Sequence, residues 1–150
     1  MALKSPITCH GMLHLLLEGL ALYETELTSV LDSSLGKPAA GILVRVQVHH
    51  AFANNTEIFD PLAEGVTDAD GRCMQLWPQP GAGQSKEELA KLKTGTLYKV
   101  VFKTKDYFEH TGRQCFYPWV EITFEVSNPD EHYHIPLLIS PYSYTTYRGS

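Results

Sequence analysis

Residues 42–50, ILVRVQVHH, alternate apolar and polar side chains with a period of two. Successive side chains on a β-strand point to opposite faces, so this alternation predicts a strand that buries Ile42, Val44, Val46 and Val48. Similar stretches follow at a spacing of about ten residues, and several short strands spaced in this way are typical of a sandwich. They are TLYKVVFKT (96–104), FYPWVEITFEV (116–126), HYHIPLLIS (132–140) and YSYTTYR (142–148). We therefore predict an all-β fold, a two-sheet β-sandwich of roughly seven to eight strands.

Turn and loop signals separate these strands. Gly and Pro in residues 33–41 predict a loop, and DADG (68–71) predicts a turn between the apolar segment ending near Val66 and a strand at 72–77. The simplest interpretation of the segment ending near Val66 and the strand at 72–77 is that they form a hairpin. Residues 105–112 predict one or two helical turns that stop at Gly112. Residues 78–95 predict a loop followed either by a short helix capped by Ser85 or by a solvated charged surface.

Composition limits the function. The chain has 150 residues, 43% of them hydrophobic, which suits one compact domain. The net charge of −5 and the absence of any Lys/Arg block argue against nucleic acid or an anionic membrane as a partner. A small molecule or a protein is the expected partner. Cys9, Cys73 and Cys115 are widely spaced without a C-x-x-C pair, so neither a disulfide framework nor a zinc knuckle is expected.

A leucine-rich segment near the start, GMLHLLLEGLALYETELTS (11–29), has helical spacing and interrupts β-type sequence. Its apolar part, residues 12–23, contains His14 and Glu18 and is shorter than the roughly 20 residues that span a bilayer. It also lacks the flanks of a signal peptide. We expect a cytoplasmic protein, with the peroxisome as the alternative.

His132 and His134 stand two residues apart, so both project to the same face of a strand. A metal site needs three or four ligands, and no other His or carboxylate has telling spacing, so no metal is expected.

Three separated segments resemble the transthyretin-like family, specifically its 5-hydroxyisourate hydrolase branch. They are HIPLLISPYSYTTYRGS (134–150), TDADGRC (67–73) and VLDSSLGKPAAGILVRV (30–46). In this family the hydrolases carry a His before V-L-D, an Arg after D-G and a His before the P-L-L run, whereas the carriers have Lys, Glu and Thr. Arg72 and His134 are of the hydrolase type.

The first of these three positions departs from the pattern, because Ser29 precedes Val30-Leu31-Asp32. Joining His10 directly to Val30 gives ITCHVLDSSLGKPAAG, a close fit to the opening strand of the family. The segment 11–29 therefore resembles an insertion placed immediately after the expected catalytic His. Its 19 codons, 57 nucleotides, can encode intron-like splice signals. The alternatives are a retained intron and a genuine insertion that forms a short helix, within one domain spanning 1–150.

The resemblance implies hydrolysis of 5-hydroxyisourate during urate degradation, without a cofactor, by a homotetramer. It assigns His10 and His134 to water activation and proton transfer, which suits imidazoles because they titrate near neutral pH. It assigns Arg72 to binding and polarising the anionic substrate. Tyr147 and Ser150 would complete the pocket. The alternative is a catalytically impaired isoform, or a protein of the same family that only binds a small ligand.

Overall fold

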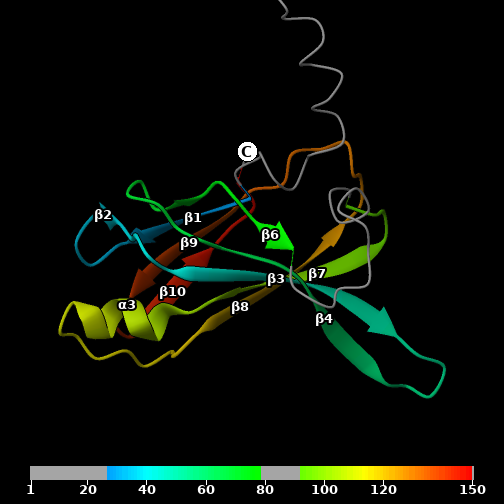
Figure 1. Ribbon diagram of the computed structural model, residues 1–150, viewed down its shortest axis with the longest axis horizontal. Helices are drawn as coiled ribbons and strands as arrows, with labels where there is room; N and C mark the ends of the chain where they lie inside the picture. The colour runs from blue at the N-terminus through cyan, green and yellow to red at the C-terminus, as the bar shows by residue number, and fades with distance from the viewer. Residues whose placement is uncertain (1–26, 79–91, 150) are drawn as a thin grey trace, which may run out of the picture.

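The computed structural model describes residues 27–78 and 92–149, which form two β-sheets and one short helix, α3 (Thr104–His110) (Figure 1). The first sheet has the order β10-β9-β1-β2, with β5 also paired to β1. Its strands are β1 (Thr28–Asp32), β2 (Lys37–Pro38), β5 (Arg72–Cys73), β9 (Ile135–Ser140) and β10 (Ser143–Thr146). The second sheet has the order β6-β4-β3-β7-β8. Its strands are β3 (Leu43–Ala51), β4 (Glu57–Val66), β6 (Trp77–Pro78), β7 (Thr96–Phe102) and β8 (Val120–Val126).

The core lies between the two sheets, and the period-two pattern explains which side chains enter it. Ile42 and Val44 are 0% exposed and Val46 is 2% exposed, while Val48 packs partly buried against the same cluster. The opposing sheet contributes residues such as Val30 and Leu137. The predicted all-β, two-sheet sandwich with a short helix is confirmed. Seven of the described strands have four or more residues, and β2, β5 and β6 have two each.

Helix α3 begins one residue before the predicted helical turns and closes the connection from β7 to β8. Phe108 on its inner face is 1% exposed and anchors it to the core. Gly112 adopts φ of 69°, a left-handed conformation that glycine takes without strain. The predicted end of the helix at Gly112 is confirmed to within two residues, since the last helical residue is His110.

The predicted hairpin around residues 68–71 is only partly correct: the turn is present and residues 77–78 pair antiparallel with β4, but residues 72–73 do not. The strand expected at 72–77 divides into β5, which pairs with β1, and β6, which pairs with β4 in the other sheet. Between these short strands the chain passes over Gly65 of β4, where an added Cβ would lie 2.2 Å from the Gln75 carbonyl oxygen. The chain does reverse after this turn, but it pairs with β1 of the first sheet at β5 before it returns to pair with β4 at β6.

The end of the segment 11–29 lies in the first sheet. Leu27 and Thr28 are buried, and Ser29 continues directly into Val30 as part of β1. His10, residues 11–26, Ser150 and the predicted helix near Ser85 lie outside the described residues. In the described ranges, none of the helices is long and apolar enough to cross a membrane.

Candidate active site

Strand β1 is the element that assembles the site. Its residues alternate, with Thr28, Val30 and Asp32 buried and Ser29 and Leu31 on the other face. Ser29 lies between two neighbours in the sheet, opposite Arg72 of β5 and opposite Pro136 of β9. Directly opposed residues share a face of the sheet, so Arg72 projects on the same side as Ser29, away from the core.

His134 reaches this same face from the start of β9. It stands two residues before Pro136, so the period of the strand brings its side chain to the side that Ser29 occupies. The Ser29 Oγ atom lies 3.1 Å from Nε2 of His134, a hydrogen-bond distance. The structure thus brings together Arg72 and His134, two of the predicted site residues, and adds Ser29 between them.

The C-terminal segment fixes the other edge of His134. Gly149 donates its N–H to the His134 carbonyl oxygen at 2.8 Å, and the two residues form an antiparallel bridge. A Cβ at position 149 would lie 2.4 Å from Nδ1 of His134, so only glycine leaves room for the imidazole. In the ribbon the C-terminal segment returns beside the beginning of β1 (Figure 1).

A tight turn holds Arg72 in place. Asp68 accepts hydrogen bonds from the backbone N–H groups of Asp70 and Arg72 at 2.9 and 3.0 Å. Gly71, at φ of 73°, lies so close to β1 that its carbonyl accepts the Val30 N–H at 2.7 Å. The D-G-R sequence therefore places its arginine against β1 because glycine alone permits both this backbone conformation and this approach.

Cys73 follows Arg72 but is not suited to nucleophilic chemistry. Its side chain is 1% exposed. Burial raises the pKa of the Cys73 thiol, and the negative charge of Asp68 raises it further, to about 11. The thiol is therefore protonated at neutral pH, and it lies on the buried face of the sheet, opposite Thr28 of β1. Cys73 and Cys115 are both free thiols, and Cys9 is outside the described residues.

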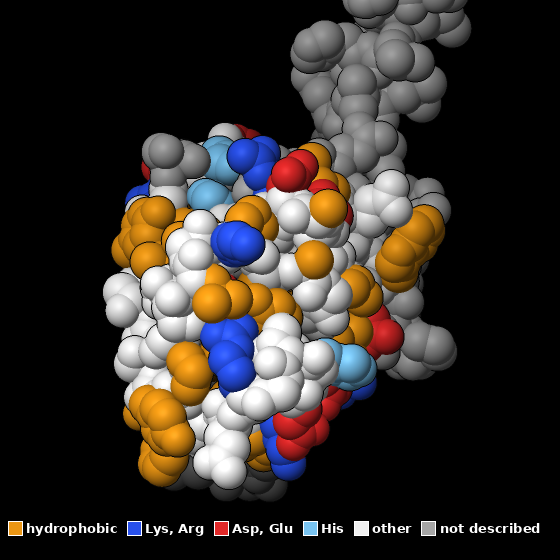
Figure 2. Space-filling model, turned by 90° about the vertical axis from the view of Figure 1, so that its left-hand side faces the viewer, with side chains coloured by type: hydrophobic (Ala, Val, Ile, Leu, Met, Phe, Trp, Pro, Cys, Tyr) orange, Lys and Arg blue, Asp and Glu red, His pale blue; other side chains and the backbone are white. Residues whose placement is uncertain are grey.

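His132, which was not predicted as a site residue, lies beside His134. The rings of His132 and His134 have centroids 6.5 Å apart. Within the two described ranges, no three His, Cys, Asp or Glu side chains are grouped in a way that could hold a metal ion. Figure 2 shows pale blue histidine side chains next to blue Lys and Arg side chains at one end of the molecule, with red Asp and Glu side chains close by.

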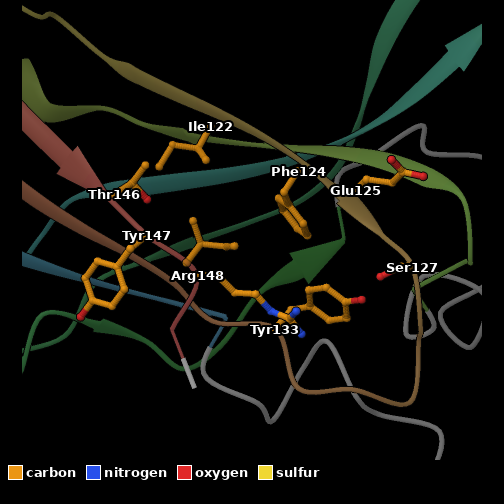
Figure 3. A pocket seen from close by; sticks show the side chains of 9 residues that line it. Ile122, Phe124, Glu125, Ser127, Tyr133, Thr146, Tyr147 and Arg148 are labelled. Carbon is orange, nitrogen blue, oxygen red and sulfur yellow. The ribbon is translucent and has the colours of Figure 1, made fainter.

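Tyr147 belongs to a neighbouring pocket of about 260 Å³ between β8 and the C-terminal segment. Figure 3 shows its ring directed away from Phe124, and 58% of the residue is exposed. Tyr147 stands two residues before Gly149, so it belongs to the segment that contacts His134. Ser150, the other predicted pocket residue, is outside the described residues, as is His10.

Sequence reasoning missed Ser29 as a site residue. It treated the residue as the end of an inserted segment that separates His10 from Val30. The available signal was the period of two that runs backward from Asp32 through Val30 to Thr28, which predicts that Ser29 shares the outer face with Leu31.

Comparisons with known proteins identify the relatives of this chain. The model of the HIUase/Transthyretin family matches residues 27–149. A 5-hydroxyisourate hydrolase of Caulobacter vibrioides is 42% identical over 127 residues, covering 82% of this chain and 96% of that protein. One from Mus musculus is 37% identical over 123 residues, covering 82% and 92%.

Two solved structures are similar in fold. The Klebsiella pneumoniae 5-hydroxyisourate hydrolase has a TM-score of 0.58 at 28% identity, covering 82% of this chain and 96% of that one. Sea bream transthyretin in complex with thyroxine has a TM-score of 0.61 at 28% identity, covering 81% and 92%.

Proposed function

The chain belongs to the HIUase/Transthyretin family, and from this premise we propose that it hydrolyses 5-hydroxyisourate to 2-oxo-4-hydroxy-4-carboxy-5-ureidoimidazoline in the degradation of urate to allantoin. The observation that carries the proposal is the placement of His134 and Arg72 on one face of the first sheet, on either side of β1. Relatives named 5-hydroxyisourate hydrolase, from bacteria and from mouse, support it.

Opening the ring at an acyl carbon needs an activated water and a stabiliser for the oxyanion that develops. A neutral imidazole at His134 takes a proton from the attacking water and returns it to the departing ring nitrogen. Arg72 offers fixed N–H donors to the anionic ring and to the developing oxyanion. The hydrolysis needs no redox step, and we propose that it needs no cofactor.

His10, Tyr147 and Ser150 complete the proposed set. His10 supplies a second imidazole, and Tyr147 and Ser150 line the substrate pocket. The support for Tyr147 is its place in the segment that contacts His134 through Gly149. The roles of His10 and Ser150 rest on the family resemblance alone.

We also propose a homotetramer in the cytoplasm. Within the described sheets β8 and β10 each have one neighbour and are edge strands, and exposed strand edges favour pairing with another chain. Tyr144 on β10 is 40% exposed and Phe116, shortly before β8, is 67% exposed. Light scattering after gel filtration should give a mass near four times 16.8 kDa. A monomer would contradict the assembly.

The proposed reaction is tested by following the loss of freshly generated 5-hydroxyisourate. The wild-type chain should accelerate this loss, and His134→Ala should lower kcat/KM by about 10²-fold or more. Arg72→Ala should lower it by about tenfold to 10²-fold. The matched controls are His50→Ala and Arg45→Ala, which remove an exposed imidazole and an exposed guanidinium from β3 in the other sheet. Both controls should keep wild-type kcat/KM.

A second pair of variants tests the segment near the N-terminus. His10→Ala should lower kcat if His10 is catalytic. A chain lacking residues 11–29, in which His10 takes the place of Ser29 before Val30, tests whether that segment impairs the reaction. No activity in either the wild-type chain or the shortened chain would overturn the hydrolase assignment. Activity in the shortened chain alone would identify the full chain as an impaired form.

A further inference from the structure

Ser29 contacts His134, and the mechanism proposed above gives this contact no role. Its Oγ atom lies 3.1 Å from Nε2 of His134, across the seam where β1 runs parallel to β9. The two residues are 105 apart in the sequence, so the contact depends on the register of the sheet. Thr28, the neighbour of Ser29, fixes that register because its buried hydroxyl donates to the Ile135 carbonyl oxygen at 2.5 Å.

The imidazole of His134 is held on two edges. Its Nδ1 edge lies against the Cα of Gly149, where an added Cβ would be 2.4 Å away, and its Nε2 edge meets Ser29. A hydroxyl can donate a hydrogen bond to a neutral ring nitrogen or accept one from a protonated ring nitrogen. Ser29 can therefore keep its contact with Nε2 in both protonation states of His134.

Arg72 lies on the other side of Ser29, opposite it in the β1–β5 pair. A residue between the proposed base and the proposed anion-binding group sets their separation, because all three side chains stand on the same face.

We propose that Ser29 is a positioning residue for His134. Its hydroxyl accepts the hydrogen bond from Nε2–H and so holds the neutral imidazole in the tautomer that leaves Nδ1 to take the proton of the attacking water. The chain thus uses a hydroxyl and an imidazole as a pair at the β1–β9 seam. This inference rests on the proposed function, because the orientation matters for the rate only if His134 is the base.

The kinetic test compares variants on the same seam. Ser29→Ala removes the hydroxyl and should lower kcat about threefold to tenfold, the range expected for one neutral hydrogen bond, with KM within about twofold. Ser29→Thr keeps a hydroxyl and suits a strand, so it should restore kcat to within about twofold of wild type. Ser33→Ala is the matched control, because Ser33 donates to the Ile139 carbonyl oxygen at 3.0 Å further along the same seam. It should keep wild-type kcat.

Wild-type kcat in Ser29→Ala, or an equal loss in Ser33→Ala, would overturn the positioning role. A loss in Ser29→Ala that Ser29→Thr does not restore would also overturn it, because the hydroxyl would then not be the group that matters.

A second measurement separates this inference from the proposed function. In protein labelled with ¹⁵N-histidine, the Nε2 resonance of His134 should shift in Ser29→Ala and return in Ser29→Thr. An unchanged resonance in Ser29→Ala overturns the inference whether or not the protein turns over substrate. If the resonance shifts but the wild-type chain has no hydrolase activity, the contact stands and the proposed function fails.

Discussion

Nη2 of Arg113 lies 2.5 Å from Oδ2 of Asp32, which joins the turn after α3 to the end of β1. The Tyr107 hydroxyl donates to the same Oδ2 at 2.9 Å, and the Ser34 hydroxyl donates to Oδ1 at 2.5 Å. Asp32 is 0% exposed. Burial raises the pKa of its carboxyl, but the hydrogen bonds from Arg113, Ser34 and Tyr107 and the charge of Arg113 outweigh burial and hold the pKa at about 2. Asp32 is therefore a buried anion that anchors the strand carrying Ser29.

This depressed pKa predicts a loss of stability in acid. The unfolded chain, with a carboxyl pKa of 3.8, binds a proton at higher pH than the folded protein does. The contribution of Asp32 is therefore complete above about pH 4 and is lost as the pH falls toward about 2, a change of about 2 kcal/mol. Urea unfolding at pH 7, 5, 4, 3 and 2 should show this loss in the free energy of unfolding.

Two variants assign the acid effect to Asp32. Asp32→Asn removes the titrating group. The fall in the free energy of unfolding between pH 4 and pH 2 should therefore be about 2 kcal/mol smaller in this variant than in wild type. Glu109→Gln alters the exposed pair that Glu109 forms with Lys105 on α3, and should leave the pH dependence as in wild type. The same pH dependence in Asp32→Asn and in wild type would contradict the assignment.

Thr67 should be a stability determinant, because its buried hydroxyl has two backbone partners. Thr67 Oγ1 donates to the Ala39 carbonyl oxygen at 2.8 Å and accepts from the Ile42 N–H at 2.9 Å. Thr67→Val has the same shape but leaves both backbone groups without this partner, and should cost about 3 kcal/mol in urea unfolding. The exposed residue Thr56 supplies the control: Thr56→Val should change stability by less than about 0.5 kcal/mol. Equal effects in both variants would show that the buried hydroxyl has no special role.

The sequence predicts local structure here better than it predicts partners. The period of two is a property of one strand, and it identified the buried face of β3 before any neighbour was known. The destination of residues 72–78 was not predictable in the same way, because the turn at 68–71 has the same signals whether the next strand pairs with β4 or with β1. The Asp32–Arg113 pair joins residues 81 apart, and no local pattern encodes it.

The same distinction between local patterns and long-range partners applies to the candidate site. Arg72 and His134 were predictable because each lies within a short motif that resembles a known family. Ser29 also lies in such a motif, directly before Val30, but its contact with His134 was not predictable, because it depends on the register between β1 and β9, and register is set by packing across the whole sheet.

Gly71 should be essential for placing Arg72. Its φ is 73°, and an added Cβ would lie 2.3 Å from the Val30 carbonyl oxygen, a backbone atom of β1 that cannot move alone. Gly71→Ala should cost about 3 kcal/mol or more in unfolding free energy and should lower kcat/KM. Gly36→Ala separates backbone strain from the clash, because Gly36 has φ of 64° with nothing within 4 Å of the added Cβ. It should cost about 1 kcal/mol and leave kcat/KM unchanged. Similar costs for the two variants would contradict the close approach of Gly71 to β1.

Gly149 should be required for activity more than for stability. A Cβ at position 149 would meet Nδ1, Cγ and Cβ of His134 at 2.4, 2.9 and 3.1 Å, so the imidazole must move away from residue 149 in Gly149→Ala. We expect kcat/KM for 5-hydroxyisourate to fall by about tenfold to 10²-fold, because an imidazole displaced by about 1 Å no longer meets the reacting water correctly. The melting temperature should change by only a few degrees, since this residue lies at the end of the sheet. Gly112→Ala is the control, because it adds a Cβ at a glycine that has nothing within 4 Å of the added atom. Wild-type kcat/KM in Gly149→Ala would show that His134 does not need this orientation, which would remove the geometric basis for its role as the base.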